Sequence, residues 1–118
     1  MAASVNTMYF QGTDGVPFSV STYNASSGAV GTYLNCDQNQ VAVATSPDNF
    51  IVPKNCYLTD VIAGAATGTV EIISNGKSTG IFIDYASHGA TNSGRPKLAI
   101  PLAKGTEVRF KVIATLAA

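Results

Sequence analysis

Three groups of residues have types and spacings that could do chemistry. Asp84, Ser87 and His88 lie close together in the sequence. An acid, a hydroxyl and an imidazole are the parts of a hydrolytic triad, in which a third group on a rigid scaffold holds the base. Here the three residues lie where a strand-like run enters a glycine-rich segment. We therefore interpret them as exposed loop residues and expect no enzyme.

The run Gly76-Lys77-Ser78-Thr79 is similar to the end of a phosphate-binding loop. The full pattern needs a glycine five residues before Gly76, where this chain has Glu71. A phosphate-binding loop also joins a strand to a helix, whose N-terminus binds the phosphate. This run instead lies between two strand-like segments, so we interpret it as a hairpin turn.

The third group comprises Cys36, Cys56 and His88, the only histidine. The cysteines show no metal-ligand spacing to His88, so we expect no metal and no cofactor. A disulfide between them would close a loop of about 20 residues. The other interpretation, two separate thiols with at least one buried in a β-core, is the one we favour, because no secretory leader is recognisable.

Composition limits the class of protein. The chain has 118 residues, of which 46% are hydrophobic and 12% charged, with seven basic and seven acidic residues. This length suits one domain, and the balanced charge disfavours a nucleic-acid binder, so we expect no sequence-specific nucleic-acid partner. The N-terminus lacks the features of a signal peptide, and no apolar run is long enough to span a membrane. We expect a protein that is made and folded in a cytosol.

Most of the segments that must position these residues have the sequence patterns of β-strands. Residues 107–112 alternate apolar and charged side chains, and residues 69–74 and 79–85 flank Asn75-Gly76, a typical hairpin turn. Residues 97–102 are expected to form a strand that is short, lies at an edge or ends near Pro101, because Pro101 cannot donate a hydrogen bond to a neighbour. Further strands are expected within 50–62 and, from weaker signals, at 16–20 and 40–45. Residues 86–95 are typical of a long exposed loop, and no long helix is predicted.

These signals predict an all-β fold, a single antiparallel β-sandwich that is jelly-roll-like and has seven or eight short strands. The domain spans residues 1–118, with residues 1–15 as an extended N-terminal arm. The shared alternation predicts one common core, formed by Val70, Ile72, Ile81, Ile83, Val108, Phe110 and Val112.

Aromatic residues in the polar N-terminal part form the candidate interface. Residues 1–47 contain few large aliphatic side chains, so they offer little apolar area to a core of their own. Such aromatics anchor an arm on a neighbour or on the domain's own core more often than they bind a ligand. We predict a homo-oligomer, with three or five subunits likelier than two, that still folds without residues 1–12. The candidate interface residues are Tyr9, Phe10, Phe18, Tyr23 and Tyr33.

A second hypothesis places a binding site in the predicted 86–95 loop. His88, Asn92 and Arg95 would supply polar contacts to a ligand. The protein would then be a ligand- or receptor-binding β-sandwich, such as a glycan-binding or fibre-tip domain.

Two segments carry a resemblance to a known group of proteins. Residues 50–61, with Pro53 leading to Leu58-Thr59-Asp60, resemble the opening strand of small viral jelly rolls, and residues 100–110 resemble their late hairpin. The resemblance implies a bacteriophage structural protein: a capsid vertex (penton), minor capsid or decoration protein. It further implies other capsid proteins as partners, and a place in the virion after assembly in the host cytoplasm.

Overall fold

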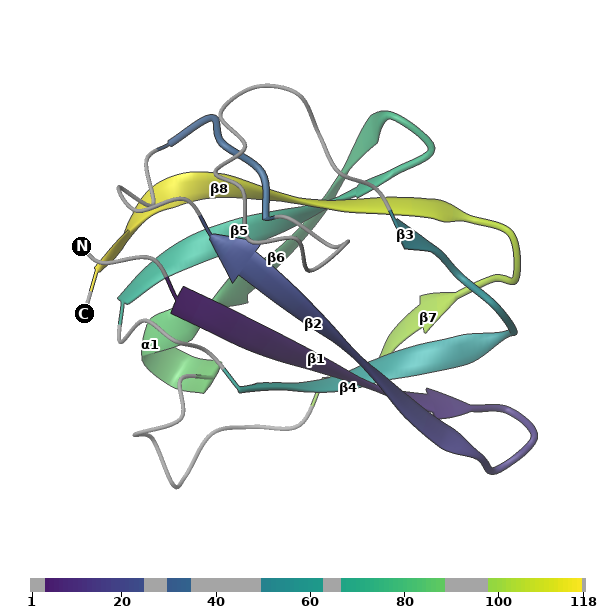
Figure 1. Ribbon diagram of the computed structural model, residues 1–118. Helices are drawn as coiled ribbons and strands as arrows, with labels where there is room; N and C mark the ends of the chain where they lie inside the picture. Colours follow the sequence, from purple (N-terminus) through teal and green to yellow (C-terminus); the bar gives the residue numbers. More distant parts are fainter. Residues whose placement is uncertain (1–3, 25–29, 35–49, 63–66, 89–97, 118) are drawn as a thin grey trace.

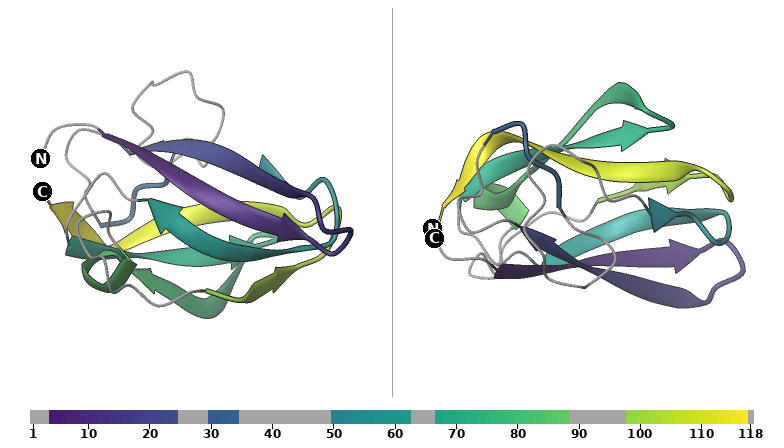
Figure 2. Two further views of the ribbon diagram at one scale, coloured as in Figure 1. Left: turned by 90° about the horizontal axis from the view of Figure 1, so that it is seen from below. Right: turned by 45° about the horizontal axis from the view of Figure 1, so that its top comes forward.

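The computed structural model describes residues 4–24, 30–34, 50–62, 67–88 and 98–117. In these ranges the chain forms an all-β sandwich of two four-stranded antiparallel sheets, ordered β2-β1-β4-β7 and β3-β8-β5-β6 (Figures 1 and 2). The predicted fold class is confirmed. The elements are β1 (Ser4–Gly12), β2 (Pro17–Asn24), β3 (Phe50–Ile51), β4 (Cys56–Ile62), β5 (Thr67–Ser74), β6 (Lys77–Asp84), α1 (Tyr85–His88), β7 (Ile100–Leu102) and β8 (Glu107–Ala117).

The strands pair in a nested order. β5 pairs with β6, β4 with β7, and β3 with β8, so each pair encloses the previous one along the chain. β2 is the next strand outward, and its partner is β1. β1 begins and β8 ends at the same end of the sandwich (Figure 1). A long hairpin folded over into two sheets in this way is a jelly-roll arrangement. Here β1 lies between β2 and β4, the position that the strand after β8 would take in a jelly roll.

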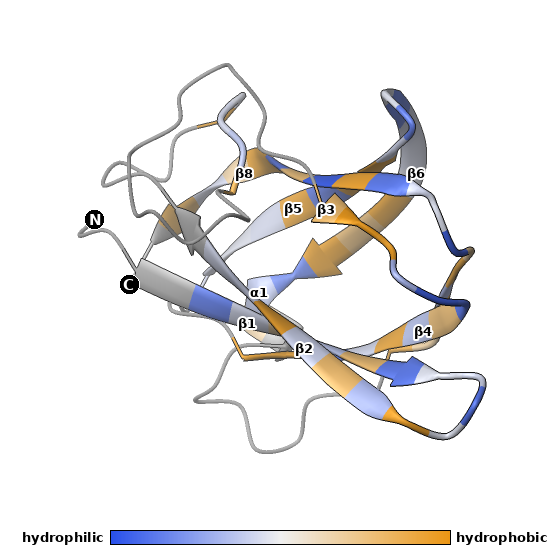
Figure 3. Cartoon of the chain, turned by 45° about the vertical axis from the view of Figure 1, so that its right-hand side comes forward, coloured by the Kyte–Doolittle hydropathy of each residue, from blue (hydrophilic) through white to orange (hydrophobic). Residues whose placement is uncertain are grey.

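The core lies between the sheets and follows the alternation of side chains along the strands. Figure 3 shows this alternation along β8, where hydrophobic and hydrophilic residues take turns. Six of the seven predicted core residues are buried: Val70, Ile72, Ile83, Val108, Phe110 and Val112.

The seventh, Ile81, was wrongly predicted, since it is 37% exposed. Glu71 stands opposite Phe82 and Ile73 opposite Ser78, so residues 79–81 of β6 face a single residue of β5. This bulge breaks the two-residue period that would have turned Ile81 inward. The Glu71 carboxylate stabilises the bulge by accepting hydrogen bonds from the Ser78 hydroxyl and from the Gly80 N–H at 3.1 Å.

The hairpin turn between β5 and β6 is confirmed. Asn75 and Gly76 have φ angles of 52° and 78°, both in the left-handed region that a two-residue type I′ turn requires. The Asn75 side chain also fixes the neighbouring strand, because its Oδ1 accepts the Glu107 N–H at 3.0 Å. The same turn therefore joins β5 to β6 and sets the start of β8.

The N-terminal part corrects the prediction of an extended arm. Residues 4–12 do not form an extended arm: β1 pairs with β2 on one side and with β4 on the other. Its Met8 and Phe10 lie in the core, and Phe10 stacks on Phe18 with ring centroids 4.8 Å apart. Met8 and Phe10 thus pack into the domain's own core.

Other predicted elements have mixed outcomes. The weak strand at 16–20 is confirmed as β2, and β7 is a short edge strand of three residues around Pro101. Residues 85–88 form one helical turn, whereas the rest of the predicted 86–95 loop and the strand at 40–45 lie outside the described residues.

Candidate interaction surface

The outer face of the β2-β1-β4-β7 sheet is almost free of charge. Among the residues of these four strands only Asp60 is charged at neutral pH, and its carboxylate accepts the Val61 N–H at 2.8 Å. The strands of the other sheet carry six charged residues: Glu71, Lys77, Asp84, Glu107, Arg109 and Lys111. The two outer faces therefore suit different surroundings, and the uncharged one costs less to remove from water.

Two tyrosines stand out of this uncharged face. Met8 and Phe10 point inward, so Tyr9 between them points outward; Tyr57 does the same between Cys56 and Leu58. Tyr9 is 42% exposed and Tyr57 45% exposed.

The two tyrosines lie on the same face of neighbouring strands. Tyr57 stands opposite Gln11, and Tyr9, two residues from Gln11 along β1, stands opposite Asp60 across a bulge in the β1–β4 register. Half-exposed tyrosines on an uncharged face are typical of the centre of a protein interface.

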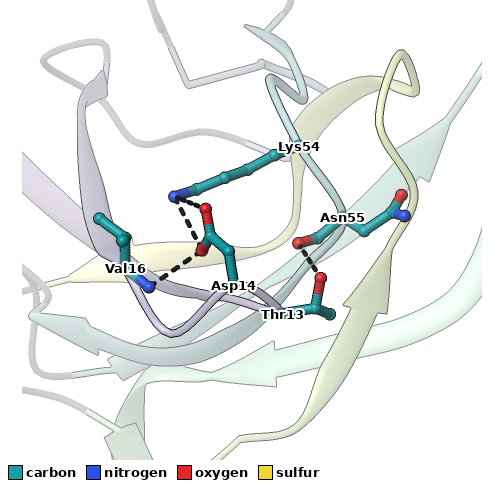
Figure 4. A network of polar contacts seen from close by, with 5 residues as sticks. All are labelled: Thr13, Asp14, Val16, Lys54 and Asn55. Carbon is teal, nitrogen blue, oxygen red and sulfur yellow. Dashed lines mark hydrogen bonds and ion pairs between the residues drawn. The ribbon is translucent and has the colours of Figure 1, made fainter.

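A polar network closes one end of the sandwich (Figure 4). Both carboxylate oxygens of Asp14 lie 3.2 Å from Lys54 Nζ, and Oδ1 also accepts the Val16 N–H at 2.9 Å. The Val16 N–H first, and then Lys54, lower the pKa of Asp14. The Asn55 carbonyl accepts both the N–H and the hydroxyl of Thr13. The network fastens the β1–β2 turn to the start of β4, and its charges are satisfied within it.

A shallow pocket of about 320 Å³ lies beside this network. Its lining includes Asn55, Cys56, Tyr57 and Pro101. Cys56 is a free, buried thiol, as the interpretation of two separate thiols requires. Burial raises the pKa of Cys56, against a smaller opposing effect of Lys54. The thiol therefore stays protonated at neutral pH and is a poor nucleophile.

The structure does not bring the five predicted interface aromatics together. Tyr9 lies on the uncharged face, and Phe18 is half-buried against Phe10. The prediction of Phe10 as an interface residue was wrong, because Phe10 is 1% exposed within its own domain and cannot contact a neighbour. Tyr33 stands opposite Lys111 of β8, in the other sheet, and Tyr23 lies in β2, where its side chain is outside the description.

The predicted ligand loop lies mostly outside the described residues. Asn92 and Arg95 fall there, and His88 is described only as the last residue of α1. Asp84 accepts the Ala86 N–H at 3.0 Å and so caps the helical turn. Within the described ranges, no group of three or more acidic, histidine or cysteine side chains is placed to bind a metal ion.

Sequence reasoning missed Tyr57 as a surface residue. The available signal was the alternation in Cys56-Tyr57-Leu58, which places Tyr57 opposite the buried face of its strand.

Comparisons with protein-family models, with curated proteins and with solved structures find no match to this chain. No helix in the described part of the chain is long and apolar enough to cross a membrane.

Proposed function

We propose that this protein is a structural component of a virion, a vertex, minor capsid or decoration protein of a bacteriophage. It acts by binding copies of itself and other capsid subunits in the virion, after assembly in the host cytoplasm. The observation that carries this proposal is the outer face of the β2-β1-β4-β7 sheet, whose strands carry Asp60 as their single charged residue and on which Tyr9 and Tyr57 are half exposed. The likeness of residues 50–61 and 100–110 to small viral jelly rolls supports the viral setting.

The polar network at Asp14 and Lys54 supports a structural role as well. Its groups pair with each other and stabilise two turns, which leaves them unsuited to binding a charged substrate. The protonated Cys56 thiol likewise offers no nucleophile. The chemistry of the described residues thus favours association over catalysis.

The direct test is to look for the chain in particles. Density-gradient-purified particles from the source of the sequence would be analysed by quantitative mass spectrometry and by immunogold labelling with antibodies against the full chain. We expect its peptides in the particle band at a fixed ratio to the major capsid protein. Peptides confined to the soluble fraction, with no label on particles, would contradict the proposal.

A second candidate function is ligand or receptor binding. The pocket beside Tyr57 favours it, because ligand pockets combine aromatic side chains with a few polar groups such as that of Asn55. Titration of the isotope-labelled chain with a panel of soluble glycans would decide. Shifts confined to Asn55 and Tyr57 that disappear in Tyr57→Ala would favour this function.

A further inference from the structure

The four edges of the two sheets differ in how they are protected. β3 has two residues, and β7 has three with Pro101 at its centre. β6 has eight residues but carries Lys77, Asp84 and the bulge at Gly80. Short length, proline, charge and bulges are the devices that keep sheet edges from pairing with other chains.

β2 has none of these devices beyond Pro17 at its first position. It is eight residues long, contains no charged side chain, and keeps an unbroken register with β1 from residue 17 to residue 24. In the described ranges, β1 is the only strand that pairs with it. Among the described residues its outer side therefore offers a row of backbone donors and acceptors to another strand.

From this contrast we propose that β2 pairs with β2 of a second copy of this chain. The two strands run antiparallel across a two-fold axis and join two four-stranded sheets into one. The proposal deepens the proposed function, because it names one self-contact of a protein that acts by association. It is additional to the ring of three or five subunits expected from the sequence.

Charge and apolar area both favour a second copy as the occupant. An identical strand placed opposite β2 meets no like charge, since neither strand carries any. Phe18 and Val20 are only partly buried where they pack at the edge of the core. Pairing would bring these side chains of one copy beside those of the other and remove more of their surface from water.

The length of the edge sets the strength of the contact. Eight residues extend over about 27 Å, and a single strand edge covers less than the roughly 800 Å² per partner of a stable complex. We therefore expect a weak dimer that forms at high protein concentration and is reinforced where many copies gather.

Charge substitution on the edge tests the pairing. Ser19 is exposed and Ser21 is half-buried. Both alternate with Phe18 and Val20 along β2, so they lie on the outer face of the sheet. The double variant Ser19→Lys/Ser21→Lys puts like charges on both edges, and Ser19→Glu/Ser21→Glu does the same with the opposite sign. The matched control, Thr67→Lys/Thr115→Lys, adds the same charge at exposed positions of β5 and β8 in the other sheet, away from both the β2 edge and the face that carries the two tyrosines.

Association of each full-length chain would be measured by sedimentation velocity up to about 1 mM, with circular dichroism to confirm folding. We expect the unmodified chain to dimerise, each edge variant alone to associate at least tenfold more weakly, and the control to change less than threefold. An equimolar mixture of the Lys and Glu edge variants should regain the lost affinity as a heterodimer.

Three results would overturn the pairing: a monomeric unmodified chain at the highest concentration, a control as impaired as the edge variants, or a mixture that stays monomeric. A ring that both edge variants leave intact would assign self-association to another surface. None of these results bears on whether the chain is present in particles. Absence from particles would overturn the proposed function and leave the dimer measurement standing.

Discussion

Tyr85 is fully buried, and its hydroxyl has no hydrogen-bond partner in the described part of the molecule. A buried polar group without a partner costs free energy that its removal recovers. We therefore expect Tyr85→Phe to leave the free energy of unfolding unchanged or to raise it by up to about 1 kcal/mol. Urea denaturation at neutral pH measures this. A loss above about 1 kcal/mol would show that the hydroxyl is bonded, for example to a water molecule.

The same residue makes stability depend on alkaline pH. Burial raises the pKa of Tyr85 far above its ordinary value of 10.0. Above pH 10.0, the ordinary pKa, the unfolded chain releases the phenolic proton while the folded chain keeps it. The free energy of unfolding therefore falls as the pH rises. Tyr85→Phe should therefore show a shallower fall in urea midpoint than the unmodified chain above pH about 10. Parallel curves would mean that the hydroxyl titrates normally.

Two phenylalanines distinguish the core from the outer face. Phe110 is fully buried, whereas Phe82 is 53% exposed on the outer side of β6. Phe110→Ala should lower the free energy of unfolding by about 3–5 kcal/mol because it opens a cavity. Phe82→Ala is the matched control and should cost less than about 1 kcal/mol. Equal losses would contradict the register of β6 and β8.

For single residues, the two-residue period of a strand predicted burial correctly wherever the strands are regular. It failed at Ile81 because two extra residues in β6 depend on Glu71, a residue of the neighbouring strand. Phe10 was assigned to an interface because residues 1–47 hold few large aliphatic side chains, whereas it lies in the core and stacks with Phe18. Tyr9 was recognised and Tyr57 was missed, although the same alternation exposes both.

Among the elements, the β5–β6 hairpin depends most directly on backbone conformation. Gly76 has φ 78°, and a Cβ added there would meet no atom within 4 Å, so any cost is conformational. Gly76→Val should lower the free energy of unfolding by about 1–2 kcal/mol. Lys77→Val is the control, because it puts the same side chain at the next, extended position. If both variants are equally stable, the turn is not of type I′.

β1 shows why the N-terminal elements were harder to predict than the hairpin. Asn6 of β1 and Thr22 of β2 stand opposite each other and are both buried, and the Thr22 hydroxyl donates to the Asn6 carbonyl at 3.4 Å. Such a polar pair has no hydrophobic signature in either strand alone. Because it forms only when the strands meet, the sequence made a central strand look like an arm.

For the whole molecule, the position of β1 reverses the outcome expected for truncation. Deleting residues 1–12 removes the strand between β2 and β4, together with the core side chains of Met8 and Phe10. We expect the truncated chain to lose its cooperative thermal unfolding transition, followed by circular dichroism. The full chain in the same buffer is the reference. A truncated chain that still unfolds cooperatively would mean that β2 and β4 close up without β1.

The nested pairing of strands also implies an order of events when the chain folds. The β5–β6 hairpin closes the shortest loop, and once it forms, β4 and β7 are already near each other, followed by β3 and β8. Each step then pays the entropy of a short loop rather than of the whole intervening segment. Substitutions at Gly76 should therefore slow refolding, whereas substitutions at Phe50, in the β3–β8 pair that closes last, should mainly accelerate unfolding.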